Sequence, residues 1–172
     1  FYGLEFNRLD DAHLAGLLAA NADLARYKPV FDRMRAMKPH QLSDELEKFL
    51  HDQSTVGSAA WNRLFDETIA TMKVTVPLPT GAESLTVSDA LNRLSDGDRA
   101  VREAAAKGIS AAFAEKGRLF TLITNTLAKD KAIVDNWRRY PRPASARNRA
   151  NMVEDEVVEA LVSAVRASFP RL

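Results

Sequence analysis

The stretch HDQSTVGSAAWNRLFDE, His51–Glu67, brings together residue types that catalysis uses: a histidine, several hydroxyls and a closing pair of acids. Nucleophilic catalysis would need a serine hydroxyl beside an oriented base. Ser58 lacks the Gly-x-Ser-x-Gly pattern of a nucleophile elbow. Apolar residues over Trp61–Met72 instead recur at helical spacing, which predicts one face of a helix turned toward a core. The stretch therefore favours structure over catalysis, with a helix end and turn over His51–Gly57.

Metal and phosphate sites lack their sequence signatures. The three histidines are His13, His40 and His51, and none of them is followed by glutamate as in His-Glu-x-x-His. The chain has no cysteine, so thiolate ligands and disulfides are excluded from it. No Gly-x-x-x-x-Gly-Lys phosphate loop occurs. We therefore assign no catalytic and no metal-binding residue, and we expect each histidine to be a surface or capping residue.

One basic segment could bind a ligand. Trp137–Arg149 contains five arginines and two aromatic residues but no acid. Arginines interleaved with aromatic rings bind phosphates and stack bases, and they equally bind carboxylates or peptide backbone. The alternative is a basic linker whose partner is the acidic run Glu154–Glu156. The formal net charge of +1 argues against nucleic acid.

The bulk composition describes a globular chain. Its 172 residues are enough to bury a core, and 46% of them are hydrophobic. No apolar run approaches the ~20 residues that span a bilayer, so we expect no membrane partner. The absence of cysteine is compatible with a reducing compartment, and we expect a cytoplasmic location. Apolar patterning runs up to both ends, from which we expect a segment truncated at both ends.

Hydrophobic periodicity predicts a mainly α fold, an antiparallel multi-helix array with one short β-hairpin. Residues 1–172 are expected to form a single helical region of a larger protein. The expected helices are about 10–37, 43–72, 86–94, 98–138 and 154–168. Pro39, Gly57 and Gly117 are expected to end or bend helices. In the last helix, the apolar residues predicted to face inward are Val158, Leu161, Val162 and Val165.

The hairpin is expected at about 73–87. Val74 and Val76 alternate with polar neighbours, which is typical of a strand. Pro79–Gly81 would form the turn, and Leu85–Val87 the returning strand. Because two strands alone are marginally stable, the hairpin should pack on helices or pair with a strand at Phe1–Phe6.

Parts of the chain resemble two known protein families. Leu94–Ala106, with its Val-Arg pair and alanine run, resembles one HEAT-type repeat, although a solenoid needs further copies. A longer resemblance is to the N-terminal helical region of the oligoendopeptidase F family, zinc metallopeptidases of the thimet oligopeptidase superfamily. The segments that carry it are LSDELEKFLHDQSTVGSAAWNRLFDETIATMKV (Leu42–Val74), LTVSDALNRLSDGDRAVREAAAKGI (Leu85–Ile109), LFTLITNTLAKDKAIVDNWRRYPRPASARNRAN (Leu119–Asn151) and VVEALVSAVRASFP (Val157–Pro170).

The second resemblance implies that this chain is a non-catalytic part of a zinc metalloendopeptidase that hydrolyses oligopeptides. In that family a His-Glu-x-x-His helix downstream holds the zinc, and a zinc-bound water attacks the peptide. That motif is absent here, so we expect the chain to be inactive alone and to form a wall of the substrate cleft. Its partners would be the downstream catalytic region and the oligopeptide. From composition, we expect Trp137, Tyr140, Arg142 and Arg147 to face the substrate. The alternative is a HEAT-like protein-interaction module without enzymatic activity.

Overall fold

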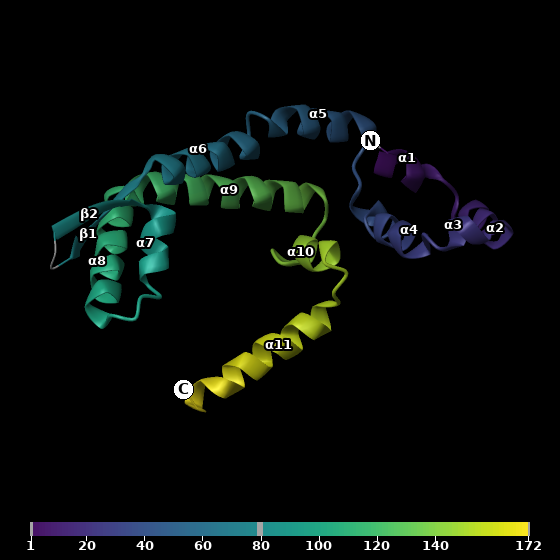
Figure 1. Cartoon of the computed structure of the whole chain (residues 1–172). Coiled ribbons are helices and arrows are strands. Elements are labelled where there is room, and N and C mark those ends of the chain that lie inside the picture. Colours follow the sequence, from purple (N-terminus) through teal and green to yellow (C-terminus); the bar gives the residue numbers. More distant parts are fainter. Residues whose placement is uncertain (1, 79–80, 172) are drawn as a thin grey trace. The chain divides into compact units, whose positions relative to one another are not determined.

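The computed structural model describes residues 2–78 and 81–171, and it confirms a mainly α fold with one short β-hairpin (Figure 1). The α-helices are α1 (Tyr2–Arg8), α2 (Asp11–Ala20), α3 (Ala22–Ala25), α4 (Lys28–Arg35), α5 (Asp44–Ser54), α6 (Ser58–Thr71), α7 (Val87–Arg93), α8 (Arg99–Glu115), α9 (Gly117–Trp137), α10 (Ser145–Ala150) and α11 (Asp155–Ser168). The strands are β1 (Lys73–Leu78) and β2 (Gly81–Thr86), and short 3-10 turns are η1 (Lys38–His40) and η2 (Phe169–Arg171).

Several expected helices are divided. The stretch 10–37 contains α2, α3 and α4, because Asn21 caps a new helix with its side chain and Pro29 opens α4 at a position where no amide donor is needed. The stretch 43–72 breaks before Gly57, and the stretch 98–138 breaks at Lys116–Gly117, as expected for these glycines. Residues 145–150 form α10, a helix that the sequence analysis did not predict.

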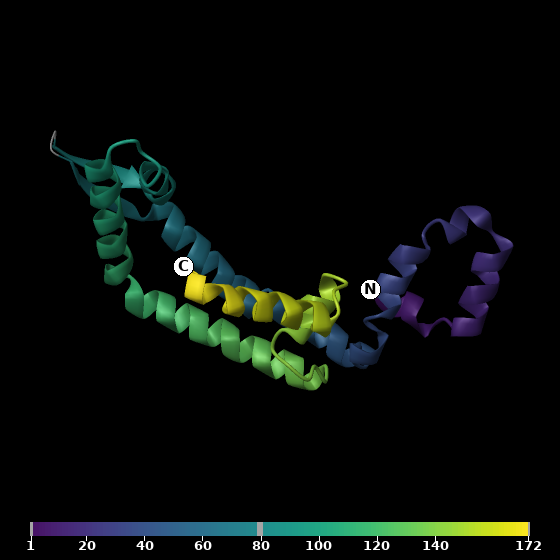
Figure 2. The same ribbon diagram turned by 90° about the horizontal axis from the view of Figure 1, so that it is seen from below.

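The N-terminal segment corrects one expectation. Tyr2–Arg8 is helix α1 rather than a strand beside the hairpin. Its Phe6 ring is buried and stacks on Phe31 of α4, with ring centroids 5.1 Å apart. In both Figure 1 and Figure 2, α1 and α4 lie side by side. A helix brings Phe6 onto this partner, which explains why the apolar pattern of the segment does not mark a strand.

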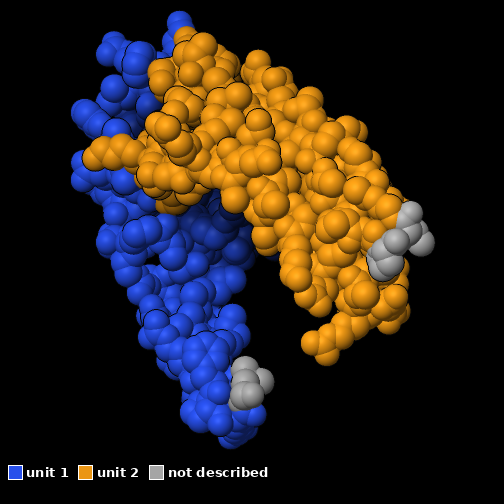
Figure 3. Space-filling view, turned by 90° about the vertical axis from the view of Figure 1, so that its left-hand side faces the viewer, with its two compact units in different colours: residues 1–50, 132–172 blue, residues 51–131 orange. Residues whose placement is uncertain are grey.

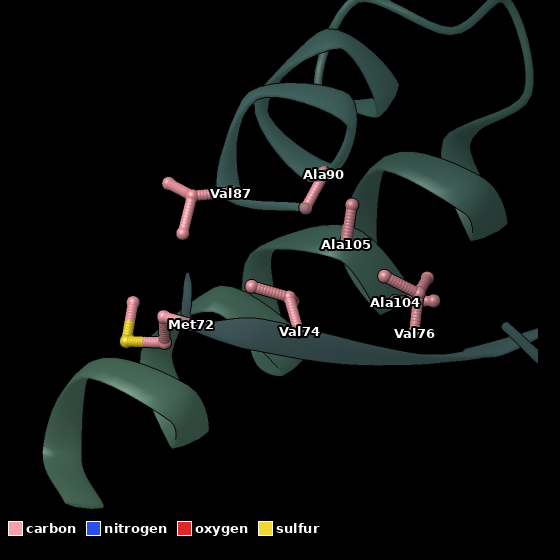
Figure 4. Packing of buried hydrophobic residues seen from close by; sticks show 7 residues of the cluster. All are labelled: Met72, Val74, Val76, Val87, Ala90, Ala104 and Ala105. Atoms are coloured by element: carbon pink, nitrogen blue, oxygen red, sulfur yellow. The ribbon is translucent and has the colours of Figure 1, made fainter. Parts of the chain in front are cut away.

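The hairpin is antiparallel and pairs Lys73 with Thr86 at its open end. The turn residues Pro79 and Thr80, which the sequence analysis placed in the turn, lie outside the described residues. Val74 and Val76 are fully buried and form the centre of an apolar cluster with α7 and α8 (Figure 4). The cluster consists of Met72, Val74, Val76, Val87, Ala90, Ala104 and Ala105. The hairpin therefore packs on helices, which was the first of the two arrangements expected.

Close packing between α8 and β1 depends on Gly108. A Cβ atom at this position would lie 2.4 Å from the carbonyl oxygen of Thr75 and 3.3 Å from a methyl group of Val74. The helix therefore approaches the strand through backbone atoms, at a distance that only glycine permits.

The chain divides into two compact units. Unit 1 is Phe1–Leu50 with Ala132–Leu172, and unit 2 is His51–Lys131 (Figure 3). The apolar cluster lies wholly within unit 2. The prediction of a single helical region in a larger protein is not tested by this division.

Two helical faces are more exposed than expected. On α6, Leu64 and Phe65 are exposed and Trp61 is only partly buried, although Met72 just after the helix is buried. On α11, Leu161, Val162 and Val165 are exposed, and Val158 is partly buried. The inward-facing expectation is therefore wrong for Leu64 and Phe65 and for most of the α11 face, but it is confirmed at the end of α6, where Ile69 packs against the apolar cluster that contains Met72. Periodicity identified the apolar faces, but it does not supply the surface that covers them.

Candidate functional site

The arginine-rich segment begins with a side chain that is locked in place. Arg138 follows α9, and its guanidinium forms a bidentate ion pair with the carboxylate of Glu47 of α5, with N–O distances of 2.7 and 2.8 Å. Its Nη1 also donates to the carbonyl oxygen of His40, at 3.1 Å. The Arg138 side chain is 23% exposed and that of Glu47 is 12% exposed. Arg138 therefore holds the end of α9 against α5 and η1.

His40 completes this cluster from the other side. Its ring is buried, and its Nδ1 lies 2.8 Å from the carbonyl oxygen of Arg138. Because a carbonyl oxygen only accepts, Nδ1 carries the proton. The Tyr140 ring stacks on the His40 ring, with centroids 4.0 Å apart, and the Tyr140 hydroxyl lies 4.0 Å from Met37 Sδ. The expectation that each histidine is a surface or capping residue is wrong for His40.

The ion pair between Arg138 and Glu47 shifts the pKa of both side chains. The hydrogen bonds from Arg138 hold the pKa of Glu47 below its ordinary value, and partial burial opposes this shift. The backbone amide of Leu42 donates to the same carboxylate and lowers that pKa further. In return, the hydrogen bonds to Glu47 raise the pKa of Arg138. The pair therefore stays ionised at neutral pH and acts as a structural clamp rather than as an acid or base.

Two of the four expected substrate-facing residues have partners within the chain. Tyr140 packs on His40, as described. Arg142 binds two acids of α11, with Nη2 2.5 Å from Asp155 Oδ2 and Nη1 2.8 Å from Glu159 Oε1. The hydrogen bond that Asn148 donates to Asp155 is the largest cause of the lowered pKa of that carboxyl, and the bond from Arg142 adds to it. The contacts of Arg142 therefore agree with the alternative interpretation of the segment as a basic linker, in which the acidic run Glu154–Glu156 supplies a partner within the chain.

The other two expected residues face solvent. Trp137, the last residue of α9, is 57% exposed. Arg147 lies on α10 and is exposed, and its side chain forms no hydrogen bond or ion pair with residues 2–78 or 81–171. Of the four, these two have the surface freedom that a ligand contact requires.

The ends of α9 and α10 both adopt an uncommon backbone conformation. Arg139 and Met152, just past these helices, have φ angles of 59° and 54°, in the left-handed region that glycine usually occupies. The amide of Tyr140 then returns to the carbonyl of Asp135, and that of Val153 to Asn148. These bonds close both helices and direct the chain from α9 through α10 into α11.

A depression opens beside α10. Its volume is about 380 Å³, and Ala36, Pro141, Asn148, Val153 and the acidic start of α11 are among the residues that line it. Ser145 also lines it; its hydroxyl is buried and has no hydrogen-bond partner. Arg149 at the rim donates to the carbonyl of Ala36, at 3.1 Å. With one arginine and three acids, the lining favours no particular ligand charge.

Sequence reasoning missed the clamp formed by Glu47, Arg138 and His40. Arg138 lies 91 residues from Glu47 and 98 residues from His40 in the sequence, so no local pattern connects it with them. Glu47 lies in the first turn of α5, where an acid is favourable at any helix start, so its presence there did not indicate a distant partner.

The described residues offer no metal centre. No group of three or more histidine, aspartate or glutamate side chains within residues 2–78 and 81–171 is arranged to hold an ion. None of the described helices has the length and apolar character needed to cross a bilayer.

Comparisons with known proteins identify what the chain resembles. Residues 5–73 match the family model described as oligopeptidase F. Over its whole length the chain is 24% identical to Group B oligopeptidase PepB of Streptococcus agalactiae serotype III (strain NEM316). The fold is similar to that of oligoendopeptidase-F from Enterococcus faecium, with a TM-score of 0.79 over 98% of this chain and 22% identity. It is also similar to a putative peptidase from Chlamydophila abortus, with a TM-score of 0.73 over 96% of this chain and 19% identity.

The chain corresponds to a minor part of each of these proteins. It spans 29% of the curated relative and 34% and 28% of the two solved chains. The resemblance to the oligoendopeptidase F family that the sequence indicated is therefore confirmed, for a region about one third as long as the proteins compared.

Proposed function

We propose that this relative of oligopeptidase F is the non-catalytic N-terminal part of a longer zinc metalloendopeptidase that hydrolyses oligopeptides. The observation that carries the proposal is the match of the entire chain to an oligopeptidase, together with the family match over residues 5–73. The fold similarity to an oligoendopeptidase-F supports it. The HEAT-like interaction module receives no comparable support over the whole chain.

In this proposal the zinc belongs to the rest of the polypeptide. The described side chains hold no suitable group of ligands, so none of them is assigned to the metal. When bound, zinc would activate the water that attacks the peptide carbonyl. The partners of the chain would then be the downstream catalytic region and an oligopeptide, with neither nucleic acid nor membrane involved. A cytoplasmic location is part of the same proposal and is compatible with the cysteine-free sequence.

The chain would contribute a wall of the substrate cleft. Trp137 and Arg147 are the best candidates for peptide contact because both are exposed. An indole ring packs on peptide backbone and apolar side chains. A guanidinium donates to backbone carbonyls and to carboxylates. Arg142 and Tyr140 would support these two residues by fixing the segment that carries them.

The decisive experiment compares this chain with the full-length polypeptide. Each is incubated with an internally quenched oligopeptide, with added zinc and with a chelator. We expect cleavage by the full-length protein that the chelator abolishes, and no cleavage by residues 1–172. A full-length protein that cleaves no peptide, or whose downstream sequence lacks His-Glu-x-x-His, would reject the proposal in favour of an interaction module.

The same assay tests the cleft wall. In the full-length protein, Trp137→Ala and Arg147→Gln should raise KM several-fold with kcat little changed, because uniform substrate binding is lost. Arg118→Gln, an exposed arginine within α9, is the matched control and should leave KM unaltered. Arg142→Gln should act through stability, since its guanidinium pairs with Asp155 and Glu159. An unchanged KM for both Trp137→Ala and Arg147→Gln would remove them from the cleft.

A further inference from the structure

Helix α11 carries a continuous apolar face that the rest of the described chain does not cover. The face is formed at helical spacing by the exposed Val157, Leu161, Val162 and Val165 and the partly buried Val158, and it continues into Phe169 of η2. Leu161 is 64% exposed and Phe169 59% exposed. A helix with one apolar and one polar face normally buries the apolar one. An uncovered face of this length is therefore a docking surface.

The polar side of α11 is already occupied. Asp155 and Glu159, one helical turn apart, both pair with Arg142. Asn148 of α10 also donates to Asp155. These bonds fix the rotation of α11 about its axis. Among the described residues α11 packs mainly on α10 and the turn η2, both within unit 1.

Pairing of two α11 faces from two copies of the chain would make only a small interface. A 14-residue helix is about 21 Å long. One face of such a helix buries less than the ~800 Å² per partner of a standard interface. A stable partner must therefore extend beyond α11, as a larger body of the same protein would.

We propose that the part of the polypeptide that follows this region in the full-length peptidase covers the apolar face of α11. This inference rests on the proposed function, because it takes the chain to be one region of a longer enzyme. The relatives that match the whole chain are about three times as long, so each contains a large body of further sequence. The face consists mainly of valine and leucine, and the partner surface should be equally apolar.

Labelling of introduced thiols tests this directly, since residues 1–172 contain no cysteine. Leu161→Cys and Val165→Cys report on the apolar face, and Ala160→Cys, an exposed neighbour on another face, is the control. In residues 1–172 all three should react rapidly with a maleimide. In the full-length protein, Leu161→Cys and Val165→Cys should react at least ten-fold more slowly, and Ala160→Cys should stay rapid. Labelling of the unsubstituted full-length protein gives the background from any cysteines in the downstream region.

Three outcomes would overturn the inference. Equal rates at all three positions in the full-length protein would leave the face exposed. Slow labelling in residues 1–172 alone would mean that this chain covers its own helix. Protection that disappears on dilution, together with a dimer in sedimentation, would assign the face to a second copy. Peptide cleavage by the unsubstituted full-length protein is measured in parallel, so a protected face with no cleavage would refute the proposed activity but not the docking.

Discussion

At the scale of single residues, the Arg138 guanidinium connects distant parts of the sequence within unit 1. It joins the end of α9 to Glu47 and to the carbonyl oxygen of His40, which are 91 and 98 residues away in sequence. Both charged side chains are mostly shielded from water. The pair therefore contributes more than an exposed ion pair, for which the gain is about 0–1 kcal/mol.

Glu47→Gln should reduce the stability of the folded chain at pH 7 by about 1.5–3 kcal/mol, the usual strength of hydrogen bonds to charged groups. The pKa of Glu47 is lowered by folding from its ordinary value of 4.5. The stabilisation is therefore complete above that value and is lost as the pH falls through the lower pKa of the folded state. Chemical denaturation between pH 7 and pH 3 measures this difference.

The control is Glu45→Gln, an exposed acid in the same first turn of α5. It should change stability by only a few tenths of a kcal/mol, the size of a charge effect at a helix start. If the two variants behaved alike at every pH, the clamp would contribute nothing beyond its charge.

At the scale of elements, the contact between α8 and β1 depends on a missing side chain. Gly108→Ala would place a Cβ atom against the Thr75 carbonyl oxygen, so helix and strand must separate. We expect a net loss of about 1–3 kcal/mol, typical of overpacking, despite the better helix propensity of alanine. Thermal unfolding followed by circular dichroism provides the measurement.

Gly16→Ala is the matched substitution. Gly16 lies within helix α2, and a Cβ atom there would meet nothing within 4 Å. It should therefore stabilise the chain by about 0.5–1 kcal/mol, because alanine is the better helix former. A stabilising Gly108→Ala would show that the helix and strand have room to separate.

The boundaries of the helices were predictable from the sequence only in part. Gly57 and Gly117 mark breaks between successive helices as expected, because these breaks depend on local backbone chemistry. Helix α10 went unpredicted because Trp137–Arg149 was considered only as a ligand-binding segment or as a basic linker. The sequence also identified the apolar faces of α6 and α11, but whether they are covered depends on distant or external surfaces.

The candidate site was predictable to a smaller extent. Trp137 is exposed and its contact with substrate stays a prediction, whereas Arg142 and Tyr140 have partners in the chain itself. The acidic run after Arg149 indicated from the sequence that Arg142 could form ion pairs within the chain. Nothing local indicated that Tyr140 stacks on His40, exactly as nothing local connected Arg138 with Glu47.

At the scale of the whole molecule, the two units are stabilised in different ways. Unit 2 contains the apolar cluster around Val74 and Val76. Unit 1 has few buried apolar side chains, such as Phe6 and Leu14, and depends on polar clamps between short helices. Since apolar burial is the larger stabilising term, the two units should open at different free energies.

Amide hydrogen exchange of residues 1–172, followed by mass spectrometry, tests this difference. We expect the peptides of β1 and α8 in unit 2 to exchange at least ten-fold more slowly than those of α4 and α10 in unit 1. The short α7, which packs on the same apolar cluster, is the internal control and should follow α8 rather than α10. Equal protection of α8 and α10 would show that the chain opens as one cooperative body.

The boundary between the units falls within regular secondary structure. It crosses the chain between Leu50 and His51 and between Lys131 and Ala132, and these crossings lie inside α5 and α9. A hinge of the ordinary kind uses residues in loops or at element ends. Here the nearest such residues are Thr55–Gly57 after α5 and Arg138–Tyr140 after α9. Because both crossings lie inside helices, the chain passes from one unit to the other through hydrogen-bonded helical backbone rather than through a loop.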